Sequence, residues 1–392
     1  MIAEHSDLKK TILDIAAKSL RSNIRKAQGP DGRSRHVVTA GAKQFRTVWA
    51  RDFGFTAGGL IKLGETGVVR DTLEAFLAFQ KPSGLFPHIL DTLPWYIRVA
   101  AASLGLRLPF EGRLKPYYTN QHFVIAIDSG LLLTYAAELY LKASGDVDFA
   151  VRYYPALKRG LEFYQGLLKD GLIAQPPCAD FQDTVIARRG RVFFTNLIYW
   201  KACLSLSRIA AATRNFDEAE SWNQQAARLK ENVERFFWIE DAGYFRNTET
   251  SRQLSSDGNL FAILWDFVDG SRSNRILKAM DQMNVWTPSG PRCTVPPYSW
   301  REIEPHALFA GVSDYHDSMV WMWQSALSVQ VERKMGRRTQ ENRLIEAVQK
   351  ILERDAMVCE VYDPLTSLPA RRWLYRSEGP FSWASAMLLE AI

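Results

Sequence analysis

The sequence predicts an all-α fold, an (α/α)6 toroid in which one ring of helices encloses another, with small β-hairpins in its loops. Three observations predict it. Apolar residues recur at helical spacing through most of the 392 residues. The helical segments follow one another in pairs, and strand patterns are few and short. No shift in composition and no low-complexity linker divides the chain, so we expect residues 1–392 to form a single domain.

Twelve segments place apolar residues at positions i, i+3, i+4 and i+7, the spacing of one helix face. Asp146, Ser271 and Ser313 or Asp314 precede three of them and are predicted N-caps, because short polar side chains accept hydrogen bonds from the first backbone amides. The segments are residues 7–26, 53–63, 68–80, 121–143, 148–168, 193–213, 216–236, 258–267, 271–283, 316–335, 339–354 and 380–391.

Four connections between these helices are long and rich in Gly, Pro and aromatic residues. They span residues 81–120, 171–192, 284–314 and 357–380. Loops of that length in a compact domain are usually functional. We therefore expect them to build a pocket at one mouth of the toroid.

Composition and charge exclude several classes of protein. Hydrophobic residues make up 47% and charged residues 23% of the chain, as in ordinary globular proteins. The net charge is +6, but the basic residues are scattered and no helix carries a basic stripe interleaved with aromatics, so we do not expect nucleic-acid binding. No apolar stretch reaches the roughly 18 residues of a membrane-spanning helix. The oligomeric state has no signature in the sequence.

The four cysteines, Cys178, Cys203, Cys293 and Cys359, lack both CxxC spacing and histidines at metal-ligand intervals. We expect free thiols in a reducing compartment, and neither a metal nor an organic cofactor. Residues 1–26 are charged and amphipathic and do not form the apolar core of a signal peptide. These features predict a cytoplasmic protein.

Two acidic segments far apart in the chain lie among aromatic residues. One holds Asp180 and Asp183, and the other holds Glu360. Glycoside hydrolysis needs two carboxyl groups, one protonated to release the leaving oxygen and one ionised to activate water. An arginine partner at position 188 or 189 would keep Asp183 ionised, which favours Asp180 as the acid and leaves Asp183 in reserve. Taken alone, a segment like that of Asp180 and Asp183 is more often a surface turn than a catalytic one, and Glu360 could be a loop acid that bonds Arg371 or Arg372.

Other polar and aromatic residues at predicted helix ends have the chemistry of sugar recognition. A Trp beside an Arg-Asp pair offers a stacking face, a guanidinium and an acceptor for hydroxyls. An Asp inside an apolar helix needs a partner, and a His among apolar residues can bond a hydroxyl or serve structure alone. The predicted substrate-binding residues are Trp49, Arg51, Asp52, His88, Asp128, Arg189, His316, Trp321 and Trp383.

Together these segments resemble the inverting α-glycosidases built on an (α/α)6 barrel. The similarity is greatest to alkaline/neutral invertases, followed by the amylo-α-1,6-glucosidase domains of glycogen-debranching enzymes, trehalases and processing α-glucosidase relatives. It spans roughly residues 45–392. The segments that carry it are Trp49-Ala50-Arg51-Asp52-Phe53, Ile127-Asp128-Ser129-Gly130-Leu131, Cys178-Ala179-Asp180 through Arg188-Arg189-Gly190, Tyr315-His316 with Val320-Trp321, and Glu360-Val361-Tyr362-Asp363 with Phe381-Ser382-Trp383.

The resemblance implies an inverting exo-glycosidase that hydrolyses a small α-glucoside or short oligosaccharide, with Asp180 as general acid and Glu360 as general base. The residues that would line the sugar subsite are Arg51, Asp52, Asp128, His316 and Trp383. The acid that invertases carry next to their Arg pair is Ala187 here. The resemblance therefore implies the type of reaction more than sucrose as the substrate.

Two other functions are compatible with the sequence. An (α/α)6 sugar epimerase would use a pair of histidines as acid and base, and the chain has six His to draw on. A relative that has lost activity would bind a sugar without turning it over. Loss of activity on changing a histidine would favour the first, and binding without turnover the second.

Overall fold

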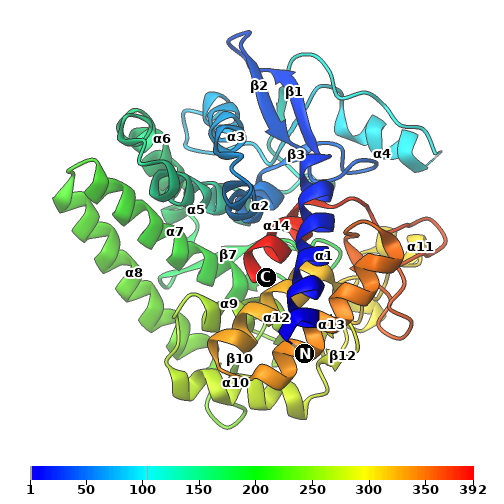
Figure 1. Cartoon of the computed structure of the whole chain (residues 1–392). Coiled ribbons are helices and arrows are strands. Elements are labelled where there is room, and N and C mark those ends of the chain that lie inside the picture. The colour runs from blue at the N-terminus through cyan, green and yellow to red at the C-terminus, as the bar shows by residue number, and fades with distance from the viewer. Residues whose placement is uncertain (1, 104) are drawn as a thin grey trace.

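The computed structural model describes residues 2–103 and 105–392. Within them, six helices form an inner ring in which each helix packs against the next and the last closes onto the first. The ring ends on α14, which lies in the middle of the molecule (Figure 1). Its members in ring order are α2 (Ala50–Lys62), α5 (Ile127–Ser144), α7 (Phe193–Ala212), α9 (Ser256–Leu264), α12 (Met322–Lys334) and α14 (Ser382–Ala391).

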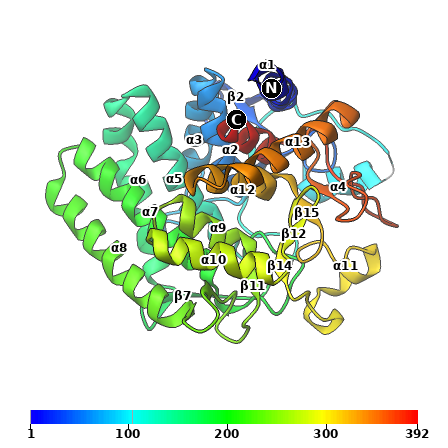
Figure 2. The same ribbon diagram turned by 60° about the horizontal axis from the view of Figure 1, so that its bottom comes forward.

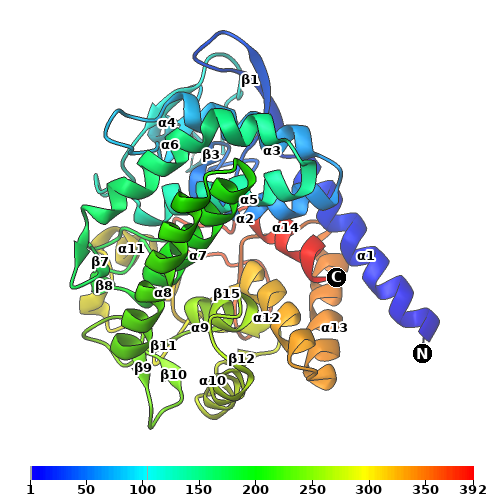
Figure 3. The ribbon, with the colours of Figure 1, turned by 90° about the vertical axis from the view of Figure 1, so that its left-hand side faces the viewer.

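Six further helices alternate with these along the chain and lie outside them, as α6 and α8 do at the edge of Figure 2. Figure 3 shows α1 against α14 on another side, and α13 packs against α1 and α12. This arrangement confirms the predicted (α/α)6 toroid. The outer helices are α1 (Ile2–Arg21), α3 (Thr66–Ala78), α6 (Val147–Gln165), α8 (Phe216–Phe237), α10 (Gly270–Gln282) and α13 (Arg338–Asp355).

The composition of a helix explains whether it lies in the inner or the outer ring. α7 is apolar around its whole circumference and is buried nearly throughout, as suits a helix with neighbours on all sides. α8 is charged except for one stripe that recurs every three or four residues, so it covers the inner ring with that stripe and faces water with the rest. The stripe consists of Ala219, Trp222, Ala226, Leu229, Val233 and Phe237.

Most predicted helices are confirmed to within a few residues, and the exceptions have local causes. The cap at Asp146 is confirmed, since its carboxylate accepts from the Phe149 amide. α10 is capped by Asp269 rather than Ser271. α12 starts at Met322 rather than near Asp314, because residues 320–321 pair as a strand instead. Two short helices inside the long loops were not predicted: α4 (Trp95–Ser103) and α11 (Pro305–Ala310).

The strands are short, antiparallel and confined to loops, as predicted. A turn of 3-10 helix, Trp300–Glu302, lies in one of the same loops. In the described residues, no helix is long and apolar enough to cross a membrane. The strands are β1 (Ile24–Gln28), β2 (Ser34–Val38), β3 (Val48–Trp49), β4 (Ile89–Asp91), β5 (Lys115–Tyr117), β6 (Leu168–Lys169), β7 (Leu172–Gln175), β8 (Gly190–Arg191), β9 (Trp238–Ile239), β10 (Tyr244–Phe245), β11 (Leu254–Ser255), β12 (Trp286–Thr287), β13 (Gly290–Pro291), β14 (Thr294–Val295), β15 (Val320–Trp321) and β16 (Val361–Tyr362).

The order of the elements sets the two mouths of the toroid apart. Short turns join the end of each inner helix to the outer helix that follows it, whereas the long connections lead into the starts of the inner helices. The inner helices therefore run parallel to one another, and the long loops gather at the mouth where they begin. The residue before each inner helix has extended backbone angles.

Candidate active site

A cavity of about 290 Å³ lies at this mouth, near the lower end of the usual size of ligand sites, ~300–1,000 Å³. All four long loops supply lining residues, which include Trp95, Asp183, Val312 and Tyr375. The first residues of α2 and α14, and Trp321 just before α12, also line it. The predicted site residues that line it are Trp49, Arg51, Asp52, Asp183, Trp321, Glu360 and Trp383.

Glu360 immediately precedes β16, and its side chain lines the cavity. Because β16 pairs with β15, Glu360 lies next to the start of α12. Two phenols hold its carboxyl group: Tyr315 donates to Oε1 at 2.8 Å and Tyr375 to Oε2 at 2.7 Å. Burial raises the pKa of Glu360 to about 8, and the two hydrogen bonds oppose that rise because they stabilise the carboxylate. Glu360 is therefore a strongly basic carboxylate once it is ionised.

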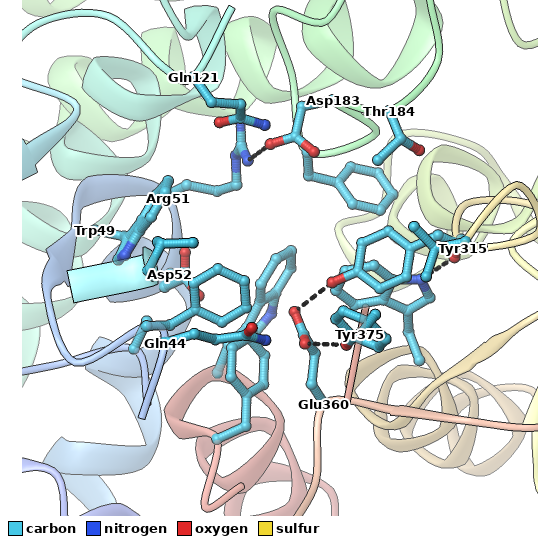
Figure 4. A pocket seen from close by; sticks show the side chains of 18 of the residues that line it. Gln44, Trp49, Arg51, Asp52, Gln121, Asp183, Thr184, Tyr315, Glu360 and Tyr375 are labelled. Carbon is cyan, nitrogen blue, oxygen red and sulfur yellow. Dashed lines mark hydrogen bonds and ion pairs between the residues drawn. The ribbon is translucent and has the colours of Figure 1, made fainter. Parts of the chain in front are cut away.

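Asp183 points into the cavity from the side opposite Glu360 (Figure 4). Burial raises the pKa of Asp183, while Arg51 and a hydrogen bond from Gln121 work against that rise. Arg51 Nη1 lies 3.4 Å from Asp183 Oδ2, and Arg51 Nε lies 2.5 Å from Asp128 Oδ2. A raised pKa suits a carboxyl group that must hold a proton, and a nearby guanidinium stabilises the anion left after its transfer.

Asp52 lies between these two acids along the wall, next to Arg51 at the start of α2. Burial raises its pKa to about 7. Trp49 Nε1 and Arg51 Nη2 are buried donors with no hydrogen-bond partner among the described residues. Buried N–H groups normally donate a hydrogen bond to a protein, water or ligand acceptor. The hydroxyls of a sugar can accept from these donors and can donate to Asp52.

Asp180 does not line the cavity. Its side chain is buried, and Oδ2 lies 2.7 Å from Arg188 Nε. Arg188 also pairs with Asp257, at 2.9 Å from Nη2. The expected pairing is thus reversed: Arg188 engages Asp180, and Asp183 is the acid that faces the cavity. We therefore replace Asp180 by Asp183 as the candidate acid, because an enclosed, ion-paired carboxylate does not reach a substrate.

Four other predicted binding residues also lie outside the lining. Asp128 is buried behind Arg51 and orients it through their ion pair. Arg189 is exposed. His88 and His316 are buried and use Nδ1 to bond Ser129 Oγ and Thr184 Oγ1, each at 2.7 Å. Asp128, His88 and His316 thus lie behind lining residues, packed against Arg51, Trp49 and Trp321, and Arg189 lies on the surface.

Burial lowers the pKa of both His88 and His316 well below the ordinary value, so both rings are neutral. An epimerase of this fold would need histidines in contact with the substrate, and none is found among the described residues that line the cavity. The described residues also contain no group of three or more His, Cys, Asp or Glu placed to hold a metal ion.

Several lining residues were not singled out from the sequence: Gln44, Phe45, Trp95, Val99, Gln121, Phe181, Thr184, Val312, Tyr315, Tyr375 and Phe381. Tyr375 has the clearest role, since it bonds Glu360 from 15 residues further along the chain. The only signal for it was its place in the long loop 357–380. Tyr315 and Phe381 lay within motifs noted above, but their roles depend on contacts that no motif spells out.

The fold is shared with solved glycosidases. A rhamnosidase from Klebsiella oxytoca with rhamnose bound superposes with a TM-score of 0.71 at 13% identity, over 98% of this chain and 63% of that one. A GH63 mannosylglycerate hydrolase from Thermus thermophilus in complex with glucose gives a TM-score of 0.65 at 16% identity, over 95% of this chain and 98% of that one. This chain thus spans less than two thirds of the rhamnosidase.

The same hydrolase in complex with Tris and D-glycerate gives a TM-score of 0.69 at 15% identity, over 96% of this chain and 99% of that one. No curated protein sequence matches. A family model described as the mannosylglycerate hydrolase MGH1-like glycoside hydrolase domain matches residues 180–384, more than half of the chain. That span includes Asp183, Glu360 and Trp383, and the chain belongs to this family of glycoside hydrolases.

Proposed function

We propose that residues 1–392 form one catalytic domain, an inverting exo-glycosidase that releases a single sugar, glucose, from a small α-glucoside. The observation that carries the proposal is the pair Asp183 and Glu360, facing each other across one cavity with the hydroxyl-binding groups of Arg51 and Asp52 between them. The glucose bound to the similar hydrolase from Thermus thermophilus supports the choice of sugar. The four buried free thiols support a cytoplasmic location.

In the proposed reaction Asp183 donates its proton to the glycosidic oxygen as the bond to the anomeric carbon breaks. Glu360 takes a proton from a water molecule that attacks the opposite face of the sugar, so an α-glucoside yields β-glucose. Arg51 stabilises the Asp183 carboxylate that remains. Tyr315 and Tyr375 hold Glu360 in one orientation, and a carboxylate has lone pairs left to accept the water proton.

The test is to follow the released anomer by proton NMR for wild type and Glu360→Gln, with sucrose, trehalose, maltose, isomaltose and glucosylglycerate. Mannosylglycerate and an α-rhamnoside belong in the set because similar structures bear those names. We expect the β anomer to form first with wild type and no product with Glu360→Gln, while the surface control Glu353→Gln behaves as wild type. The α anomer first would contradict inversion. Binding without release would favour the inactive relative.

The two carboxyl groups predict an unusual pH dependence. Burial raises the pKa of both Asp183 and Glu360, so both titrate above the ordinary carboxyl values of roughly 4. Activity should rise with pH as the base ionises and fall as the acid loses its proton. We therefore expect kcat/KM to be maximal at neutral or mildly alkaline pH. A maximum near pH 4–5 would contradict the proposed pair.

Tyr375→Phe extends this test. The phenol stabilises ionised Glu360, so its removal raises the pKa of Glu360 and moves the profile towards alkaline pH, together with a loss of kcat. Tyr118→Phe is the matched control, because that hydroxyl bonds the Phe79 carbonyl outside the cavity. An unshifted profile in Tyr375→Phe would show that Glu360 is not the titrating base.

A further inference from the structure

The residues that line the cavity differ in burial and in polarity. The charged groups Arg51, Asp52 and Glu360 are buried in its depth. The half-buried lining residues Phe45, Trp95 and Val99, from the loop before α2 and from α4, form an apolar side of the cavity. Other half-buried lining residues are polar: Gln44, Gln121, Asp183 and Thr184. The buried charged groups suit a hydroxyl-rich sugar. The leaving group of an exo-acting enzyme must exit past the more exposed lining residues, of which Phe45, Trp95 and Val99 form the apolar side.

The side chains on the apolar side of the cavity pack against one another. Trp49 contacts Phe45 and Trp95 edge-on, with ring centroids 5.8 and 6.5 Å apart. On another part of the lining, Val312 and Tyr375 follow Phe309 and Trp373 in sequence. The rings of Phe309 and Trp373 meet edge-on at 5.1 Å. Both are more than half exposed, 66% and 72%, so an apolar surface pair lies within three residues of the lining in sequence, although neither residue lines the cavity.

The charges of the lining also disfavour a negatively charged leaving group. Of the described side chains that line the cavity, Arg51 is the one cation, and it is already paired with the buried Asp128. Asp52, Asp183 and Glu360 are acids. Outside the lining, Arg98 is bound to Asp91 and Arg372 to Asp314, and Arg46, which follows Phe45, donates to the Leu108 carbonyl. A leaving group that carries a carboxylate would enter a cavity lined by acids, with no cation in the described lining other than the paired Arg51, which costs binding energy.

We infer that the leaving-group subsite takes a neutral, apolar alkyl or aryl group, and that Trp95 is its specificity-determining residue. The inference rests on the proposed function, because it concerns the other half of the same substrate. It separates this chain from a hydrolase whose leaving group is the glycerate anion.

The test compares kcat/KM for methyl, hexyl and benzyl α-glucosides and for glucosylglycerate. The first three leave as alcohols of similar acidity, so their differences report binding of the leaving group rather than its reactivity. Each buried methylene adds roughly 0.8 kcal/mol, so we expect the hexyl and benzyl glucosides to exceed the methyl glucoside by at least about tenfold. Glucosylglycerate should not exceed methyl glucoside. Equal rates, or a preference for glycerate, would overturn the inference while leaving the glycosidase proposal intact.

Trp95→Ala supplies the residue-specific test. We expect it to lower the hexyl-to-methyl ratio several-fold, whereas Tyr96→Ala, an exposed neighbour on α4 outside the lining, leaves the ratio unchanged. If no glucoside is hydrolysed, the proposed function has failed, and affinity then decides the inference separately. Tighter binding of hexyl than of methyl glucoside in a calorimetric titration, lost in Trp95→Ala, would support it, and equal binding would overturn it.

Discussion

Asp183→Asn is expected to lower kcat by roughly 10²–10⁴-fold while leaving the thermal unfolding temperature close to that of wild type. The amide keeps the size of the carboxyl group and can still bond Arg51 and Gln121, but it has no proton of suitable acidity to give the leaving oxygen. Kinetics on the substrate identified by NMR, with circular dichroism to verify the fold, would measure the effect.

Asp180→Asn is the matched control, three residues away in the same loop. It removes the charge that Arg188 contacts at 2.7 Å, so the expected effect falls on stability, by up to roughly 3–5 kcal/mol, with kcat of the folded fraction largely kept. If instead Asp180→Asn abolished turnover in a stable protein and Asp183→Asn did not, the assignment of the acid would return to Asp180.

Arg188→Met is expected to be the most destabilising single change of this loop. Arg188 and both its partners, Asp180 and Asp257, are at most 1% exposed in their side chains. Its removal would leave two carboxylates buried together, and breaking one such pair costs roughly 3–5 kcal/mol. That is a large part of the whole stability of a typical domain, about 5–15 kcal/mol. Urea unfolding should show the loss, and Arg189→Met, next to it but exposed, should change stability by less than about 0.5 kcal/mol.

The same variant has a predictable pH dependence. Burial already raises the pKa of Asp257, and loss of Arg188 removes the charge that opposes that rise. A carboxyl whose pKa is higher in the folded than in the unfolded state favours folding below the unfolded value of about 3.9 and loses that contribution as pH rises. The deficit of Arg188→Met relative to wild type should thus grow from pH 4 to pH 8. The triple change Arg188→Met, Asp180→Asn, Asp257→Asn should remove that pH dependence, and a constant deficit would contradict the account.

The sequence predicted the helices well because their signal is local. Whether α8 belongs to the outer ring follows from a stripe of six apolar residues, and α7 is inner because it has no polar face. The long loops were likewise visible in composition, and with them the approximate location of the pocket. Helix starts were predicted less accurately where a distant segment pairs with the residues before the helix. Residues 320–321 pair with residues 361–362 as strands, so α12 begins only at Met322.

The site was predicted as a set of residue types but not as an arrangement. Asp180 and Asp183 lie three residues apart in an irregular loop, where no periodicity tells which carboxyl faces the cavity. Their partners decide it: Arg188 lies close in sequence, whereas Arg51 lies 132 residues before Asp183. The basicity of Glu360 depends in the same way on Tyr315 and Tyr375 and on burial, which exist only in the folded chain.

By itself, then, the sequence determined the helical ring architecture, the loops that form its functional mouth, and the carboxyl, guanidinium and indole groups available there. Tertiary structure alone decided that Asp183 and Glu360 share one cavity, that Asp180 serves the core, and that His88 and His316 are neutral supports. The reason is physical: helix formation is governed by neighbours within a few turns, whereas pKa, ion pairing and access to a ligand are set by groups that the fold brings together from distant parts of the chain.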